Sequence, residues 1–549
     1  IFTEMLEDAN VTVLYEAQVQ QVKKTGAHIN QIVLTDGRII SGTVFIDAGY
    51  EGDLFSRADV SYIVGRESDT TYNETLNGRT IKNSGNQIDQ VVDPYDEHGN
   101  LIPLIFNGTF TWPNGTQEFM GYGDAHQADR KVQAYNFRLC ITKNTSNMIN
   151  FTKPDNYDPA RWELVRRTGG FSSGVSCNQG AIPNGKYDAN NCGGVSTDFI
   201  GGSWGYPDAN YTERQQIWTE HMDYLQGYIW TIMSDPTLKH PQGWGLCADE
   251  FPDTKGWPPA LYVRAARRLK GPKIFTQNTP REQDVMGSIG NLSIGMGCYN
   301  FDSHNAQRIA CNTSDACFGS HPGRTPPTTP YVVDEGDVQI GPGKYQIPLW
   351  VTLPDATEAN NLLVVAAPSA SHIGMSTLRM EPQFMIIGHS AGVAAALAAK
   401  GTGEVAKISL AELNAQLIAD GQTLSSGSGP NPSPPAFAYN CYANRCILVQ
   451  DASSNSTTDS KCNGKCQGLQ PNEWLANDQV FTLTQTTVAA KSKATFLKKS
   501  ELHSGGGPTG DEMPVKAHQV LQLVSPPVVI DASYHLVTLA PSSSSLSSS

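Results

Sequence analysis

The stretch Thr43–Ser68, TVFIDAGYEGDLFSRADVSYIVGRES, is the part of the chain that decides the fold class. Its apolar start predicts a buried strand, Thr43–Ile46, which ends in the small-residue turn Asp47-Ala48-Gly49. An acidic turn, Glu51-Gly52-Asp53, then leads into a predicted short helix. A strand, an Asp/Gly turn and a helix start together bring backbone N–H groups to a bound cofactor in α/β folds. We therefore expect an α/β fold with a cofactor site here, although ordinary turns share this composition.

Bulk composition bounds the class of protein. The 549 residues are enough for about three domains of ~150 residues each. Hydrophobic content of 39% and charged content of 17% are globular values. A net charge of −14 argues against nucleic acid or an anionic membrane as partner. The longest apolar run, Met385–Ala399, falls short of the ~20 residues of a membrane span, so we predict none.

Roughly the first three quarters of the chain, residues 1–424, read as an interrupted α/β domain. Residues 11–49 alternate like short strands, starting with VTVLYEA, and Asp36-Gly37 is a hairpin signal. We assign residues 1–72 and 331–424 to this domain and residues 73–330 to an inserted substrate domain. The insert is rich in Trp, Tyr, Asn, Gly and Pro, and its predicted helices are Glu213–Ser234 and Leu261–Leu269.

The returning α/β segment contains three further predicted elements. NLLVVAAPSAS is a strand that leads into a loop. PQFMIIGHSAGVAAALAAKG predicts a strand, a turn and an Ala-rich helix closed by Gly401, and a second helix follows at Ser409–Ile418. This order of elements supports an α/β architecture.

The C-terminal part differs in composition. SSGSGPNPSPP, within the linker 425–440, precedes a small Cys-containing β module at 441–540 and a Ser-rich tail at 541–549.

Close cysteine pairs predict disulfides in an oxidising compartment, namely Cys311 with Cys317, Cys441 with Cys446 and Cys462 with Cys466. The last two pairs could instead bind zinc, but we favour disulfides and predict no metal site. Ten Asn-x-Ser/Thr sequons, such as those at Asn10 and Asn455, point the same way, to a secreted glycoprotein.

The segment Gly388-His389-Ser390-Ala391-Gly392 matches the G-x-S-x-G pattern of serine hydrolases. Alone it predicts an esterase whose nucleophile, Ser390, stands at a strand-to-helix turn. Such an enzyme also needs an acid and a histidine downstream, for which the candidates are Asp420, Asp451, His503, His518 and His535. These residues lie at or beyond the linker-bounded edge of the domain, which weakens the hydrolase interpretation.

A second constellation, Tyr299–His304, places Asp302 close to His304. A carboxylate can orient an imidazole for acid–base work, although a surface turn gives the same pattern. His372, on a loop after a predicted strand, is a second candidate base. Arg379 could hold a phosphate or a substrate carboxylate.

Basic positions cluster in LYVRAARRLKG. In the predicted helix, Arg264 and Arg268 lie four residues apart and share one face. We expect Arg264 to bind an anionic group, and Arg267 to join an ion-pair network with Asp249 and Glu250.

These motifs, taken in order, resemble the FAD-dependent oxidoreductase family often described as xanthan-lyase-like, over roughly residues 1–424. The resemblance implies a Rossmann-like domain, incomplete at its N-terminus, because no G-x-G-x-x-G follows an early strand. We therefore expect an upstream segment that carries this turn. The latter part of the C-terminal module resembles SH3-like accessory modules of secreted hydrolases.

The resemblance also implies FAD as cofactor and hydride transfer from a substrate to the flavin. Its implied cofactor contacts are Asp47, Ala48, Gly49, Glu51, Gly52, Asp53, Arg379, Gly388, Ala391 and Gly392. The last three belong to a Gly-x-x-Ala-Gly-x-Ala-Ala pattern, whose helix N-terminus would face the flavin ring. The implied catalytic set is His304, His372, Asp302 and Arg264.

A small polar molecule, such as a sugar or other polyol, is the expected substrate, because aromatic residues lie near these motifs, namely Trp204, Trp244, Trp257 and Tyr299. The family's association with polysaccharide breakdown implies the same class. The C-terminal module could contact a glycan or cell wall.

Two other interpretations stay open: a serine hydrolase built on Ser390, and a catalytically inactive secreted binding protein derived from the flavoenzyme. The family usually has Thr where this chain has Gly49, which removes one polar contact to the cofactor.

Overall fold

The computed structural model describes residues 2–425, apart from 81–85, 89, 113–114, 121–124, 170–179, 192, 239–242, 287–288 and 312–328, and beyond residue 436 only the strands given below. The chain forms two compact units. The first comprises residues 1–313 and 327–427, and the second comprises residues 314–326 and 428–549. The finer division of the first unit into a cofactor domain and an insert stays a prediction.

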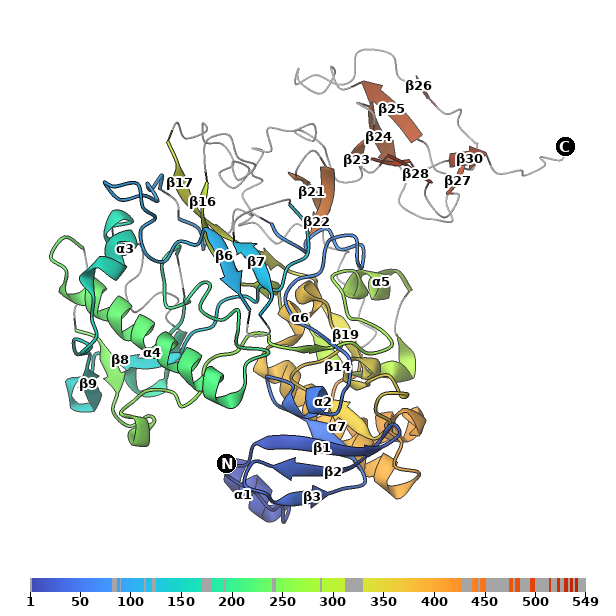
Figure 1. Cartoon of the computed structure of the whole chain (residues 1–549). Coiled ribbons are helices and arrows are strands. Elements are labelled where there is room, and N and C mark those ends of the chain that lie inside the picture. The colour runs from blue at the N-terminus through green and yellow to red at the C-terminus, as the bar shows by residue number, and fades with distance from the viewer. Residues whose placement is uncertain are drawn as a thin grey trace. The chain divides into compact units, whose positions relative to one another are not determined.

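The first unit begins with an antiparallel three-stranded sheet (Figure 1). After helix α1 (Phe2–Asp8) come β1 (Val19–Thr25), β2 (His28–Leu34) and β3 (Ile39–Ser41). The predicted hairpin at Asp36-Gly37 is confirmed, with Gly37 in the left-handed region at φ 87°. The predicted strand at residues 11–17 is wrong, because this segment is almost entirely exposed and has no strand partner among the described residues.

A parallel strand pair forms the α/β element predicted from Thr43–Ser68. Strand β4 (Phe45–Asp47) pairs with β20 (Leu362–Val364), and helix α2 (Asp53–Arg57) follows β4 as predicted. Because the strands are parallel, their carboxyl ends meet at one edge, where open α/β sheets bind ligands. The fold thus brings the turn after residue 47 beside the segment after residue 364.

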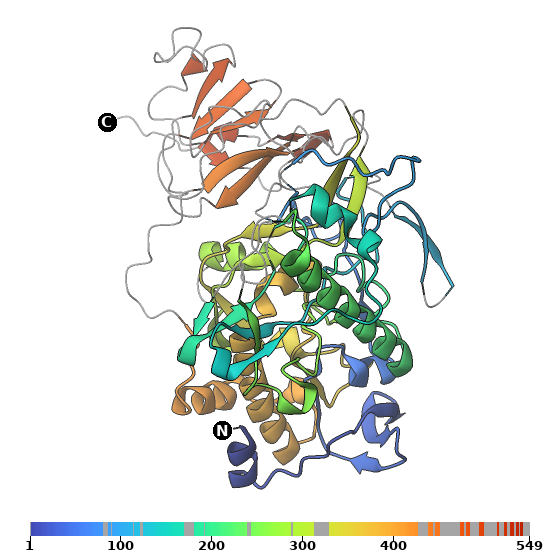
Figure 2. The same ribbon diagram turned by 90° about the vertical axis from the view of Figure 1, so that its left-hand side faces the viewer.

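A five-stranded antiparallel sheet organises the middle of the chain, in the order β10 (Gly180–Ile182), β11 (Lys186–Ala189), β8 (Leu139–Thr142), β12 (Gly245–Cys247) and β9 (Met148–Asn150). The long helix α4 (Tyr211–Ser234), green in Figure 1 and Figure 2, confirms the predicted helix. Asn210 and Glu213 form a capping box that fixes where it begins. Its buried face, which includes Tyr224 and Tyr228, shares one apolar core with Leu139 and Leu246 of the sheet.

A disulfide between Cys140 and Cys247 joins β8 to β12. These cysteines are 107 residues apart, so no local spacing signals the pair. Cys311 is also disulfide-bonded, and its predicted partner Cys317 lies outside the described residues. Cys298 is free and exposed.

Short elements connect these layers. The remaining ladders are β5 (Tyr62–Ile63) with β13 (Arg268–Leu269), β6 (Gly108–Thr111) with β7 (Gln117–Met120), β14 (Ser293–Gly297) with β19 (Tyr345–Pro348), β15 (Phe301–Ser303) with β18 (Val338–Ile340), and β16 (Gln307–Cys311) with β17 (Tyr331–Glu335). The other helices are α3 (Glu163–Arg167), α5 (Thr279–Met286), α6 (His372–Leu378), α7 (Glu381–Lys400) and α8 (Leu410–Ala419). Helix α8 confirms the helix predicted at Ser409–Ile418.

Helix α7 overturns the predicted strand and turn before residue 390. It begins at Glu381, with Pro382 in the first turn, and is helical throughout. Phe384, Ile387 and Ala391 lie on its buried face at helical spacing, so the apolar run belongs to a helix rather than a strand. Of the described helices, α7 alone is long and apolar enough to cross a membrane, a test that the core helix of a soluble protein also passes.

The predicted helix at Leu261–Leu269 is also wrong. The segment is extended and is buried at almost every position, so a helix would have to bury its arginines together. Instead each arginine reaches a different acid: Arg264 pairs with Asp198, Arg267 with Asp53 and Asp208, and Arg268 with Glu67. Buried ion pairs with distant residues override the local helix preference here.

The second unit consists of β-strands in its described part. Strand β21 (Phe437–Tyr442) pairs with β22 (Arg445–Gln450), and the register places Cys441 opposite Cys446. The other strands are β23 (Glu473–Ala476), β24 (Gln479–Leu483), β25 (Ala494–Lys498), β26 (Met513–Pro514), β27 (Leu521–Leu523), β28 (Val528–Asp531), β29 (Tyr534–Leu536) and β30 (Leu539–Pro541). The pair Cys462 and Cys466 lies outside the described residues.

Candidate active site

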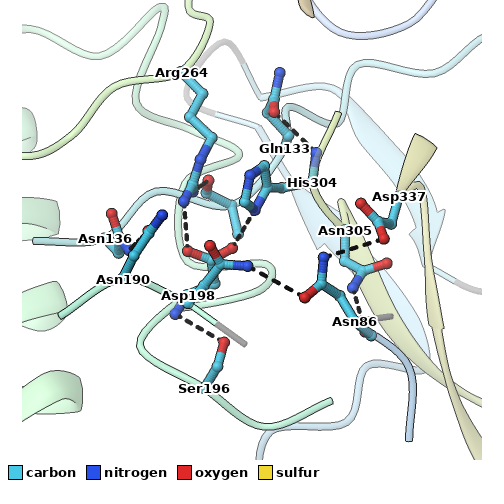
Figure 3. A network of polar contacts seen from close by, with 12 residues as sticks. Asn86, Gln133, Asn136, Asn190, Ser196, Asp198, Arg264, His304, Asn305 and Asp337 are labelled. Atoms are coloured by element: carbon cyan, nitrogen blue, oxygen red, sulfur yellow. Dashed lines mark hydrogen bonds and ion pairs between the residues drawn. The ribbon is translucent and has the colours of Figure 1, made fainter. Parts of the chain in front are cut away.

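The predicted acid–base residue His304 lies in a buried ion-pair network just after β15. Its Nδ1 is 2.7 Å from Asp198 Oδ2, and its Nε2 is 3.4 Å from Asp302 Oδ1. Arg264 Nη2 binds the other oxygen of Asp198 at 2.9 Å, and Arg379 Nη2 binds Asp302 Oδ2 at 2.9 Å. We name this alternating series, Arg264–Asp198–His304–Asp302–Arg379, the charge chain. Figure 3 shows Arg264 and His304 both pointing at the carboxylate of Asp198.

Electrostatics favour a protonated ring at His304. Burial and the nearby Arg264 lower its pKa, but Asp198 and Asp302 raise it, and the net direction is upward. Burial would raise the pKa of Asp302, yet His304 and Arg379 hold it well below its usual range. Asp198 behaves in the same way, with Arg264 and His304 outweighing burial. The two carboxylates therefore favour the protonated imidazole, and each of its nitrogens already faces a carboxylate oxygen.

Further polar side chains form hydrogen bonds to members of the charge chain and so help to hold them in place (Figure 3). Gln133 Oε1 accepts a hydrogen bond from the backbone N–H of His304 at 3.0 Å. Gln339 donates to both Asp302 and Asp337. Burial, the largest effect, raises the pKa of Asp337 to about 6, even though His304 is close.

Arg379 ends the charge chain and is not free for a phosphate. Its Nη2 donates to the main-chain oxygen of Asp302 at 2.8 Å in addition to the carboxylate contact. Its Nη1 lies 3.4 Å from Tyr262 Oη. The cofactor contact predicted for Arg379 would require these bonds to be given up.

His372, the other predicted base, lies close by but in a different electrostatic setting. It is the first residue of α6, and its Nε2 is 2.9 Å from Ser303 Oγ, next to His304 in the chain. Burial, followed by Arg268 and Arg66, lowers its pKa to about 3. The structure thus brings the two candidate bases into one region, where the electrostatics favour the charged form of His304 and the neutral form of His372.

The predicted cofactor turn after β4 contains residues that hold the turn together and residues that are exposed to solvent. Asp47 accepts hydrogen bonds from the backbone N–H groups of Gly49, Leu54 and Phe55, which cover the start of α2. Gly52 has φ 68°, and a Cβ there would lie 2.3 Å from the Phe55 ring. These residues build the turn.

Ala48, Gly49 and Tyr50 form the open part of this turn, because they are exposed at the end of a strand whose neighbours are buried. A Cβ at Gly49 would approach only Asp47 Oδ1 at 3.3 Å and Glu51 Oε2 at 4.0 Å. The surface above Gly49 is thus free for a ligand to approach.

The acidic pair after this turn is held by the middle of the chain. Glu51 Oε1 accepts from Tyr206 Oη at 3.1 Å. Asp53 contacts Arg57, Arg214 and Arg267 at 2.7–3.0 Å. Burial would raise the pKa of Asp53, but Arg214 and Arg57 lower it to about 2. The predicted network of Arg267 with Asp249 and Glu250 is wrong, since those acids pair with Lys186.

The GHSAG motif lies inside α7, so the nucleophile-elbow interpretation is wrong. Ser390 is fully buried and donates toward the carbonyl oxygens of Ile294 and Ile386. His389 is exposed and contacts Asp420 and Gln422 instead. Gly388, Ala391 and Gly392 are also in the middle of this helix, about two to three turns from its N-terminus.

The N-terminus of α7 itself lies beside the turn after β4. The rings of Tyr50 and Phe384 meet edge to face at 5.5 Å. Burial and then the charge of Glu381 raise the pKa of Tyr50. Met380, which precedes the helix, makes no side-chain cap bond. The helix N-terminus expected near the cofactor thus begins at Glu381 rather than at Gly388.

Tyr262 is a site residue that the sequence did not reveal. Its ring lies beneath two guanidinium groups, 5.1 Å from that of Arg138 and 5.2 Å from that of Arg264. Its hydroxyl oxygen faces a third, that of Arg379. The side chain is only partly buried, so Tyr262 connects the charge chain to the surface. Its position within LYVRAARRLKG was visible in the sequence, but Arg138 and Arg379 come from distant segments.

Beyond Tyr262, Arg138 leads into a pocket of about 530 Å³. Arg138 pairs there with Asp188 through Nε at 3.0 Å. Glu250 and Phe251 complete the polar and aromatic sides of the pocket. A volume of this size is within the range of small-molecule sites, roughly 300–1,000 Å³.

Comparison with known families decides the class of this site. A family model described as FAD dependent oxidoreductase matches residues 1–417. The chain belongs to the FAD-dependent oxidoreductase family. None of the curated proteins or solved structures compared with the chain matches it.

As an FAD-dependent oxidoreductase, the chain uses FAD as cofactor, and its family implies a Rossmann-like α/β fold. The observed geometry fits the cofactor at the open turn. Ala48 and Gly49 offer small side chains at the carboxyl end of β4, and the uncapped N-terminus of α7 is close by through Tyr50 and Phe384. Both features suit close approach of an electron-rich group.

The described residues of this flavoenzyme contain no group of three or more His, Cys, Asp or Glu side chains that could hold a metal ion. The charged side chains of the site are paired with one another through the charge chain.

Proposed function

We propose that this FAD-dependent oxidoreductase oxidises a polar substrate of carbohydrate or polyol type, with hydride transfer to the flavin. The observation that carries the proposal is the position of Tyr262. Its ring lies against the guanidinium group of Arg138, which lines the pocket, and its hydroxyl contacts Arg379 at the end of the charge chain. A partly exposed phenol at this junction is suited to exchange a proton with a substrate hydroxyl.

When bound, FAD supplies the two-electron acceptor that no side chain provides. Within the protein, Tyr262 Oη would pass its own proton to solvent and take the proton of the substrate hydroxyl as the carbon loses hydride, which oxidised FAD would accept. The guanidinium groups of Arg138, Arg264 and Arg379 stabilise the negative charge that forms on oxygen during this exchange. His304 would be less suited to this task, because both ring nitrogens already contact carboxylates.

The charge chain has a separate role in this proposal. Its three cations, Arg264, His304 and Arg379, exceed its two carboxylates, Asp198 and Asp302, by one positive charge. Because all five groups are buried, this charge is weakly screened. It favours negative charge at the site, whether on the substrate oxygen or on the reduced cofactor. His372 remains in the site as a neutral hydrogen-bond partner of Ser303.

We also propose that the protein passes through the secretory pathway and that the C-terminal unit is an SH3-like module that contacts a glycan or cell wall. The disulfide between Cys140 and Cys247 supports the compartment, because such bonds persist in oxidising surroundings. The sequons at Asn10 and Asn210 lie on exposed residues, as glycosylation requires.

The reaction can be tested by mixing the FAD-loaded chain anaerobically with neutral sugars, polyols and sugar acids. Loss of the oxidised-flavin absorbance with a sugar or polyol is the expected result, and no loss with any of them would overturn the proposal. For the substrate found, Tyr262→Phe should slow flavin reduction by about 100-fold and remove one ionisation from its pH profile.

Tyr157→Phe is the matched control. It also removes one partly buried hydroxyl, which contacts Thr231 far from the site. We expect this variant to reduce flavin at the wild-type rate. A Tyr262→Phe enzyme with an unchanged rate and pH profile would exclude Tyr262 as the acid–base group.

A further inference from the structure

The pocket beside Arg138 contains a strained aromatic residue. Phe251 has φ 48° and ψ 56°, in the left-handed region that bulky residues avoid. Its side chain is 39% exposed although it lines the pocket. Strain of this kind persists only where the surroundings enforce it, and it gathers at functional sites.

The surroundings of Phe251 do enforce this conformation. Lys186 Nζ clamps Asp249 at 2.7 Å and Glu250 at 2.6 Å, directly before Phe251. Asn147 exchanges two further hydrogen bonds with Asp249. After it, Gly256 N–H donates to the Phe251 carbonyl at 3.0 Å. The turn therefore holds an aromatic face open at the pocket, although packing alone would favour burying it.

The polar groups of the pocket indicate what could lie against this face. Arg138 and Asp188 offer donors and acceptors side by side, and Glu250 adds further acceptors. Counting Lys186, which pairs with Asp249 and Glu250, two cations face three carboxylates here, so the pocket has no excess positive charge to attract an anionic ligand. An apolar ring face together with hydrogen-bonding groups suits a molecule that has C–H faces and hydroxyl edges.

We propose that this pocket binds a neutral sugar unit of the substrate, stacked on Phe251, with its hydroxyls on Arg138, Asp188 and Glu250. The inference rests on the proposed function, because it names the substrate class of that enzyme. Arg138 contacts both this pocket and the ring of Tyr262, so a longer saccharide bound here would extend toward the reacting group.

Binding can be separated from oxidation by using the full chain loaded with FAD and photoreduced under anaerobic conditions, since the reduced cofactor takes up no hydride. Calorimetric titration with cellobiose, maltose and lactose tests neutral ligands, and glucuronic acid is the anionic counterpart. We expect one or more neutral disaccharides to bind, and glucuronic acid to bind more weakly. No binding by the neutral set, or tighter binding by glucuronic acid, would overturn the proposal.

Two glycine variants isolate the role of the aromatic ring. Phe251→Gly relieves the left-handed strain and removes the ring, so the melting temperature should stay or rise while affinity falls about tenfold. Lys255→Gly is the matched control, because Lys255 is also left-handed, at φ 55°, but does not line the pocket. It should leave affinity unchanged. Unchanged affinity in Phe251→Gly would exclude the stacking role.

The two proposals fail in different ways. If the disaccharides bind the reduced enzyme but never reduce the oxidised flavin, the proposed oxidation fails and the sugar pocket stands. If a substrate is oxidised but Phe251→Gly binds it normally, the reaction stands and the pocket assignment fails.

Discussion

Nδ1 of His304 lies 2.7 Å from Oδ2 of Asp198, although the two residues are 106 positions apart in the chain. The carboxylate of Asp198 favours the protonated form of the His304 imidazole, so His304 is not a free base. The same contact links the segment after β15 to the buried segment around Asp198. The stability of the folded protein and the electrostatics of the site therefore both depend on it.

The protonation of His304 predicts how stability varies with pH. Its folded pKa is raised, so its contribution to stability is fully present below the unfolded pKa of about 6.5 and is lost as pH rises through the folded value. In urea unfolding from about pH 5.5 to 9, the wild-type free energy of unfolding should therefore decline. His304→Gln should decline less, and part of the decline should remain because the folded pKa values of Asp337 and Glu74 are raised to about 6 and about 7.

A second buried histidine provides the control for that experiment. Burial lowers the pKa of His221 to about 4, so its ring is neutral over the same range. Unfolded His221 loses its proton near pH 6.5, so below about pH 7 its contribution to stability rises with pH, and His221→Gln should decline more steeply there than the wild type. Above about pH 7.5 the two proteins should decline in parallel. If His304→Gln declines with the same slope as the wild type, the imidazolium assignment is wrong.

Two aspartates with arginine partners should differ sharply in their effect on stability. Asp198→Asn leaves two buried cations, Arg264 and His304, without their counter-charge, and should cost about 3–5 kcal/mol. Asp188→Asn breaks a pair with Arg138 that is about one third exposed, and should cost less than about 1 kcal/mol. Urea unfolding at pH 7 measures both. Similar costs would show that the charge chain contributes no more than a surface pair.

The turn before α2 should tolerate no side chain at Gly52. Gly52→Ala adds a Cβ 2.3 Å from the Phe55 ring in a left-handed position, so we expect a loss of about 2–5 kcal/mol. Gly37→Ala, at φ 87° with open space around it, should cost only about 1–2 kcal/mol. Thermal or urea unfolding of both variants separates crowding from backbone strain, and equal losses would contradict the crowding argument.

Ser390 should be inert as a nucleophile. Its hydroxyl is buried in α7 and bonded to carbonyl oxygens, so a fluorophosphonate probe should leave it unlabelled in peptide mass spectrometry. Ser390→Ala should keep flavin reduction and lose about 1 kcal/mol of stability through the missing hydrogen bonds. Covalent label on Ser390 in the folded protein would restore the hydrolase interpretation.

Local sequence predicted several elements well. The strand, turn and short helix at Thr43–Ser68, the hairpin at Asp36-Gly37 and the helix at Glu213–Ser234 depend on neighbours in the chain. Apolar periodicity, turn glycines and a capping box are all local signals. The family also followed from the order of such motifs, and the match over residues 1–417 agrees with it.

The errors had nonlocal causes. Met385–Ile387 reads as a strand in isolation, but Glu381-Pro382 starts a helix and the core accepts its apolar face. Leu261–Leu269 reads as a helix, but its arginines are drawn to separate buried acids. In both segments, interactions with distant residues decided between local alternatives of similar free energy.

The sequence by itself determined the α/β class, the family and the open Ala48-Gly49 turn, because these depend on residues that are adjacent or regularly spaced. Only the tertiary structure decided the roles of His304, Arg379 and Tyr262. A buried charge must find a counter-charge, and the partners in this protein come from segments more than sixty residues apart, as Arg264 and Asp198 do. Which carboxylate meets which cation is therefore fixed by the packing of the whole unit and leaves no mark on the local sequence.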